Sequence, residues 1–114
     1  MPQYLISFDN GTMKIPAEEL AEVARAGMAV IHEAEDAGVF LFSGGFTGEE
    51  PVSVVAVDGT VVTDGPYPES KEFVGGFTVV EVATREEALR WAAKIAAVCR
   101  CPQDVREFPP QPKL

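Results

Sequence analysis

Basic residues are scarce in this sequence. Nine Lys and Arg stand against 18 Asp and Glu, which gives a formal net charge of −9. A nucleic-acid interface needs a concentrated surface of Lys and Arg, and an anionic membrane surface attracts the same side chains. The charge balance therefore argues against nucleic-acid and membrane partners.

Long apolar runs are missing as well. No stretch approaches the roughly 20 consecutive apolar residues that a membrane-spanning helix requires. The first residues, MPQYLISFD, have no basic segment ahead of an apolar core, so they do not read as a secretory signal. The expected location is the cytoplasm.

Cysteine and histidine are few. Cys99 and Cys101 are separated by one residue, which is too close for an unstrained disulfide and differs from the Cys-x-x-Cys redox spacing. The single histidine, His32, is distant in the sequence, so a structural zinc site lacks its ligands. We expect reduced thiols, no bound metal and no cofactor.

The sequence does contain a regular succession of strand and helix signals. Alternating or β-rich runs bounded by turn residues predict strands at 3–9, 39–46, 52–57, 60–64, 76–83 and 104–108. Helical spacing of apolar residues predicts one helix with Pro16 as its first residue and Gly38 as its stop. A second helix is expected to begin after Thr84, which forms a capping box with Glu87. In the second strand, simple alternation places Phe40 and Phe42 on the same face.

The order of these elements predicts an α+β fold. Asp58-Gly59 predicts a β-hairpin inserted between two β-α-β units. Two such units form the ferredoxin-like arrangement, an antiparallel sheet with two helices on one face. The chain of 114 residues suits a single domain, expected at 1–108. Residues 109–114, PPQPKL, are expected to be a loose Pro-rich tail.

The sheet face without helices is also expected to be apolar. Both sides of the VFLF stretch at 39–42 and of the TVVEV stretch at 78–82 carry large hydrophobic residues. Monomers rarely expose so much apolar surface, and most soluble oligomers are symmetric. The sequence therefore predicts a homodimer that packs through the open sheet face.

Several motifs together resemble the DGPF-type branch of the YCII-related family. The match extends from about Gln3 to Phe108 and includes the late Cys101-Pro102 and Val105-Arg106 pairs. Its specific elements are a turn, an acidic stretch with one Lys, a strand start and a helix: Asp64-Gly65-Pro66-Tyr67, Glu69 to Glu72, Gly75-Gly76-Phe77 and Glu87-Ala88-Leu89-Arg90-Trp91-Ala92.

The resemblance implies a dimeric α/β barrel, in which two ferredoxin-like sheets pack face to face. It implies little about the reaction, although a few members are credited with dehalogenase-like or other small-molecule lyase chemistry. The wider family has been suggested to use a His–Asp pair, with the His early in the first helix. Here that position falls near Gly27, whereas the histidine is His32. That role therefore does not transfer residue by residue.

Three residues are the candidate catalytic groups. Asp64 opens a turn stiffened by prolines and could act as a base, although a turn Asp more often accepts backbone N–H bonds. Tyr67 could donate a proton, and His32 is the one side chain that titrates near neutrality unperturbed, although both could be packed or boundary residues. The candidate ligand-binding residues are Ser43, Lys71, Phe77 and Tyr4.

Two classes of function remain open. One is a cofactor-free enzyme that performs proton transfer or elimination on a small molecule, in a pocket near DGPYP at 64–68 and the glycines that flank Ser43 and Phe77. The other is a non-catalytic ligand-binding or accessory homodimer, which could be regulatory. Convergence of these polar groups on one pocket would favour the enzyme.

Overall fold

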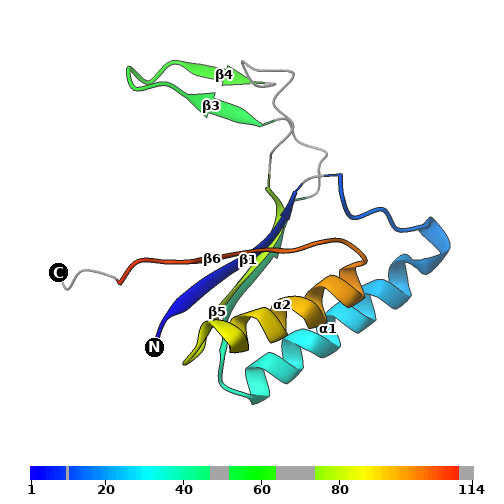
Figure 1. Cartoon of the computed structure of the whole chain (residues 1–114). Coiled ribbons are helices and arrows are strands. Elements are labelled where there is room, and N and C mark those ends of the chain that lie inside the picture. The colour runs from blue at the N-terminus through cyan, green and yellow to red at the C-terminus, as the bar shows by residue number, and fades with distance from the viewer. Residues whose placement is uncertain (10, 47–51, 64–73, 111–114) are drawn as a thin grey trace.

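Six strands and two α-helices make up the computed structural model, which describes residues 1–9, 11–46, 52–63 and 74–110 (Figure 1). A short 3₁₀ turn, η1, at Ala17–Glu19 precedes the first helix. The helices are α1 at Leu20–Asp36 and α2 at Arg85–Cys99. The strands are β1 Gln3–Asp9, β2 Phe40–Gly45, β3 Ser53–Val55, β4 Val61–Thr63, β5 Val74–Glu81 and β6 Asp104–Glu107.

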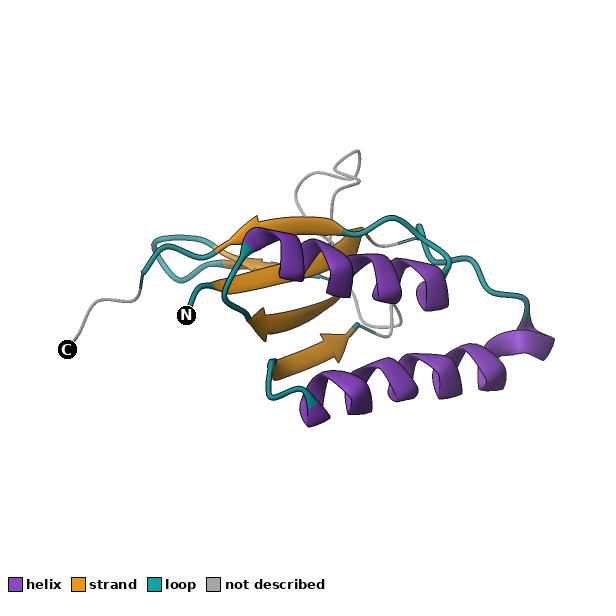
Figure 2. Cartoon of the chain, turned by 60° about the horizontal axis from the view of Figure 1, so that its bottom comes forward, coloured by secondary structure: helices purple, strands orange, loops and turns teal. Residues whose placement is uncertain are grey.

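The main sheet has the order β2-β5-β1-β6, and all of its neighbouring strands are antiparallel. Both helices cover the same face, as Figure 2 shows. This arrangement is ferredoxin-like and confirms the predicted fold class. Among the described helices, none is long and apolar enough to span a bilayer.

The core lies between the helices and one face of the central strands. Ile6 of β1 and Val80 of β5 are completely buried there. Opposite them, α2 presents Ala88 and Ala92, whose small side chains allow the helix to approach the sheet closely, together with Ile95. Dispersion contacts and loss of apolar surface to water hold this layer together.

The helix boundaries follow their capping residues. Thr84 caps α2 as predicted, because its hydroxyl accepts the Glu87 amide at 3.2 Å. Gly38, at φ +74°, follows α1 and confirms the predicted stop. The start of α1 differs: Pro16 precedes η1, and the α-helix begins only at Leu20. Neither η1 nor α1 has a side-chain hydrogen bond that caps its first turn. In the 3₁₀ turn, the Glu19 N–H instead donates to the Pro16 carbonyl oxygen.

The expected alternation of β2 is wrong at one point. Phe40 is the register partner of Val80, on the helix side, whereas Phe42 pairs with Val79 on the opposite side. An irregularity in the register between them accommodates Leu41 as an extra residue. Such a bulge reverses the faces of all later residues, so Phe42 lies on the open face and Ser43 on the helix side.

Strands β3 and β4 form the predicted hairpin. Its turn is closed by the Ala56 amide, which donates to Thr60 O at 2.7 Å, and Gly59 has a φ of +90° that favours glycine. In Figure 1 the sheet lies between this hairpin and the two helices. The radius of gyration is 16.0 Å, against about 13 Å for a compact domain of this length.

Candidate functional site

A cavity of about 310 Å³ lies between the helices and the sheet, at the end of the sheet where β2 stops and β5 starts. Most of its wall is apolar and comes from both helices, from β1 and from the segment after β1. These apolar side chains are Phe8, Met13, Ala24, Met28, Val30, Ile31, Ile95 and Val98. Its volume is at the lower end of the ~300–1,000 Å³ range of small-molecule pockets.

Four polar side chains also line the cavity. Ser43 of β2 and Thr78 of β5 are register partners on the helix side of the sheet, so their hydroxyls lie on the same wall. Cys99 at the end of α2 and Gln103 beyond it contribute the other two. None of the described lining residues is charged. The site therefore offers hydrogen bonds without an ionic partner.

Gly27 leaves space for this cavity. It lies on the buried stripe of α1, four residues after Val23 and three before Val30, and it lines the cavity. A Cβ added there would meet no atom within 4 Å. Glycine in the interior of a helix costs roughly 0.5–1 kcal/mol relative to alanine. No close neighbour requires a glycine at this position, and a larger side chain here has open space to extend into the cavity.

The Cys99 thiol is a poor nucleophile in this setting. Burial raises the pKa of Cys99, and the neighbouring Cys101 raises it further, so the reactive thiolate is disfavoured. Both cysteines are free, as expected from their spacing. The Gln103 amide donates to the Cys101 carbonyl oxygen at 3.4 Å and to its sulfur at 3.5 Å. These contacts fix the segment that follows α2 against the cavity.

Of the sequence-predicted site residues, Ser43 and Phe77 line the cavity. The two candidates present their side chains to opposite faces of the sheet, since Ser43 lies on the helix side and the Phe77 ring packs near Phe42 and Phe46 on the open face. Asp64, Tyr67 and Lys71 lie outside the described residues.

Tyr4 and His32 do not line this cavity. Tyr4 is 3% exposed in the core, near the opposite end of β1, and its hydroxyl donates to Glu107 Oε1 at 3.4 Å. Burial, followed by the negative charge of Glu107, raises the pKa of Tyr4. His32 is an exposed side chain of α1.

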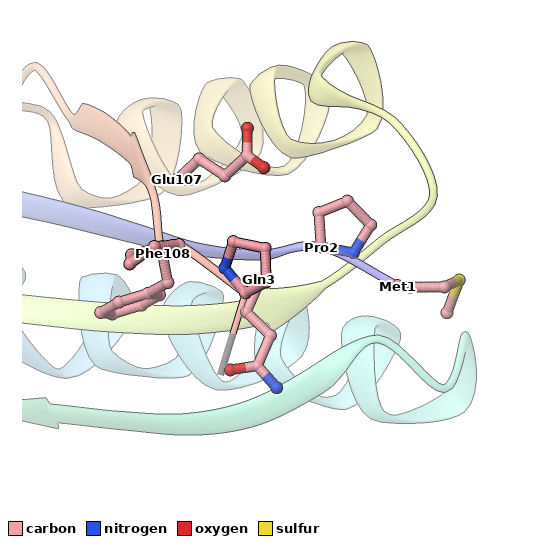
Figure 3. Close-up of a pocket in the computed structure, with 7 residues that line it drawn as sticks. Met1, Pro2, Gln3, Glu107 and Phe108 are labelled. Atoms are coloured by element: carbon pink, nitrogen blue, oxygen red, sulfur yellow. The ribbon is translucent and has the colours of Figure 1, made fainter. Parts of the chain in front are cut away.

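A second hollow, of about 440 Å³, lies near the two ends of the described chain (Figure 3). Figure 3 shows that the Glu107 carboxylate and the Gln3 amide point in opposite directions from their strands. The Gln3 amide is engaged with Glu81 at 3.0 Å. Pro109 and Pro110 form part of the wall and lead directly into residues outside the described range. This hollow brings together fewer elements than the helix–sheet cavity.

Sequence patterns missed three of the polar cavity residues. Thr78 looks like an ordinary strand residue, and Cys99 looks like part of the apolar stripe of α2. Gln103 follows a helix stop. Of these three residues, only Cys99 has a local signal in the sequence. It lies four residues after Ile95, so the two share a face of α2.

A family model described as the YCII-related domain matches residues 3–100. This span includes β1 through α2 and ends just before the segment that carries Gln103 and β6. The search of curated proteins finds no match.

Proposed function

Because the chain belongs to the YCII-related family and contains a cavity between sheet and helices, we propose that it binds a small, uncharged, mainly apolar molecule there. The observation that carries this proposal is the composition of the cavity wall: apolar side chains surround a few neutral hydrogen-bonding groups. We also assign the chain to the DGPF-type branch of the family, on the motif that begins at Asp64.

The chemistry of the wall sets the class of ligand. A charged molecule would lose its hydration in this cavity without gaining an opposite charge from the described wall, which is costly. A neutral molecule gains by burying apolar surface, at about 25 cal/mol per Å². The neighbouring hydroxyls of Ser43 and Thr78 would orient one carbonyl, hydroxyl or similar polar group of the ligand.

The reaction proposed for this site is cofactor-free proton transfer or elimination. Asp64 is the proposed base and Tyr67 the proposed proton donor, with Lys71 as a ligand contact; all three are outside the described residues. Sequence supports this assignment, since they belong to the segment that leads into the β5 glycines. His32 is not included, because its exposed side chain lies outside the cavity wall.

The second candidate is binding without catalysis. It is favoured by the described cavity wall, which has no charged acid or base and whose thiol has a raised pKa. In this case the chain is a non-catalytic, ligand-binding accessory protein.

We further propose that the working unit is a homodimer formed through the open sheet face. Phe42 is 60% exposed and Phe46 is 65% exposed on this side. Both rings lie near Phe77, at centroid distances of 5.7 and 6.5 Å. Leu5 and Val74 complete a wholly apolar hollow with Phe46 and Phe77. A second sheet packed on this surface would remove it from water.

Gly27→Leu tests the binding site. A leucine here should fill the cavity, and it should also stabilise α1, because leucine has a much higher helix propensity than glycine. We expect the neutral fluorophore N-phenyl-1-naphthylamine to bind the native chain and to bind Gly27→Leu about tenfold more weakly or worse. The melting temperature should stay the same or rise.

Ala29→Leu is the matched control, since Ala29 is exposed on the same helix and does not line the cavity. It should bind the fluorophore as the native chain does. Equal binding by Gly27→Leu and the native chain, or no binding by the native chain, would remove the cavity as the site.

Asp64→Asn separates the two candidate functions. The amide keeps one acceptor for the turn and loses the base. An enzyme that uses Asp64 should keep its fold and its fluorophore affinity but lose turnover on a neutral carbonyl substrate found by screening. Retained turnover excludes Asp64 as the base, and absence of turnover in the native chain across the screen favours the accessory protein.

A further inference from the structure

The β3–β4 hairpin exposes apolar side chains on both of its faces. Val55 and Val61 are register partners on one face, and they are 65% and 58% exposed. Val54 lies on the other face and is also exposed. Among the described elements, the two strands pack extensively only against each other.

A two-stranded ribbon in this position needs a surface to pack on. An isolated hairpin is marginally stable at best in water, and a third strand or a packed layer is normally required. The described hairpin has an ordered Asp58-Gly59 turn but no layer beneath its valines. The surface that stabilises it therefore lies outside the described residues.

The hairpin lies on the side of the sheet that the helices leave open (Figure 1). Phe42 and Phe46 of the sheet region are exposed on this side together with the hairpin valines, whereas the helices expose Leu20, Met28 and Leu89 on the other side. A second copy of the chain offers both an open sheet face and a hairpin with exposed valines. A twofold axis between two copies would form each contact twice.

The area available on the sheet supports this occupant. Four strands about 4.8 Å apart, with about six residues each at about 3.4 Å per residue, present roughly 400 Å² in projection. A standard stable interface buries about 800 Å² of accessible surface on each partner. Side-chain relief raises the first figure, and the exposed hairpin valines would add further apolar area to such an interface.

Charge also favours contact between two copies at the hairpin. The whole chain has a formal net charge of −9, which opposes self-association. Residues 52–63 contain a single charged side chain, Asp58 at the turn. The hairpin can therefore approach a second acidic chain at a small electrostatic cost.

We propose that the β3–β4 hairpin is a dimerisation arm: each copy of the chain packs its arm valines against the other copy, beside the face-to-face sheets. This inference rests on the homodimer proposed above and adds the arm as a necessary part of it. It is independent of the ligand cavity, which lies on the helix side of the sheet.

Val55→Thr combined with Val61→Thr tests the arm. Threonine keeps the β-branched shape that suits a strand but places hydroxyls where the apolar contact would form. Sedimentation equilibrium of the native chain should report a dimer of about twice 12.2 kDa. The double variant should have a dimer dissociation constant about tenfold higher or more, because two apolar contacts are weakened.

Two controls make the outcomes distinct. Leu89→Gln removes an exposed apolar side chain of α2, on the helix side, and should leave the dissociation constant unchanged. Val79→Lys places a charge on the open sheet face and should give a monomer. A native chain that is monomeric at micromolar concentration overturns both the dimer and the arm. A native dimer whose dissociation constant is unaffected by the double threonine change overturns the arm alone.

Hydrogen exchange on the native chain provides a measurement that needs no variant. Amides of residues 53–63 should be protected at concentrations where the dimer forms, and they should lose protection on dilution to monomer. Unprotected hairpin amides in the dimer would contradict a packed arm.

Discussion

The ring of Phe8 occupies the space where a side chain of Gly76 would lie. The two residues are register partners in β1 and β5. A Cβ built on Gly76 would be 2.6 Å from Phe8 Cζ and 2.7 Å from Cε1, distances that real Cβ contacts do not reach. Since Phe8 also lines the helix–sheet cavity, this glycine determines where one wall of the cavity stands.

Gly76→Ala should therefore destabilise the chain and disturb the cavity. Overpacking of this kind costs about 1–3 kcal/mol, which urea unfolding can measure. Phe8→Leu in the same chain should recover part of the loss, so the double variant should be more stable than the sum of the two single effects predicts. Additive losses would show that the methyl group is accommodated elsewhere.

Tyr4 should make stability fall at high pH. Its pKa is raised in the folded chain, so the folded state holds the phenolic proton more tightly than the unfolded state does. The resulting stabilisation is fully present below the ordinary tyrosine pKa of about 10 and is lost as the pH rises through the folded-state value. Tyr4→Phe should flatten this alkaline decline in urea midpoint. An equally steep decline in the variant would contradict the assignment.

Cys99 should react slowly with iodoacetamide, and its rate should keep rising at a pH where an exposed cysteine has reached its plateau. The reason is the raised pKa of the buried thiol. Peptide mass spectrometry can separate modification at Cys99 from that at Cys101. N-phenyl-1-naphthylamine should slow the reaction at Cys99, because this residue lines the cavity. Rapid alkylation with an ordinary pH profile would contradict both points.

Glycine should be the replacement of Arg100 that leaves the folded chain most stable. It ends α2 with φ 57° and ψ 37°, a left-handed conformation that costs a non-glycine residue about 1–2 kcal/mol. Its guanidinium bonds Glu19 at 2.7 Å, but this partly exposed pair contributes only about 0–1 kcal/mol. Arg100→Gly should therefore be more stable than Arg100→Ala by about 1 kcal/mol in urea unfolding. Equal stabilities would mean that the backbone at this position relaxes.

Local sequence signals were sufficient for the fold because they were strong and mutually consistent. The Asp58-Gly59 turn and the Thr84 cap each depend on only a few neighbouring residues, and both are present in the structure. The bulge at Leu41 could not be read in this way. Alternating apolar residues fit either face when both faces are apolar, so the reversal between Phe40 and Phe42 depends on pairing with β5.

The candidate site was predictable only in part, for a related reason. Glycines at two strand ends indicated where Ser43 and Phe77 would lie, and both line the cavity. Thr78 and Gln103 are brought to the same wall by the packing of segments far apart in the chain. The sequence does not indicate whether Tyr4 lies at the cavity or at the far end of the strand. Its position follows only from the strand register.

The strand order also constrains how the chain can fold during synthesis. β1 is synthesised before its two neighbours in the sheet, β5 and β6. Gln3 therefore cannot pair with Glu81, nor Tyr4 with Glu107, until those later strands have been made. The centre of the sheet cannot close until most of the polypeptide has left the ribosome, and pairings this distant in sequence form slowly. Until then α1 has no sheet to cover and β2 has no strand to pair with, so their apolar residues are accessible to chaperones.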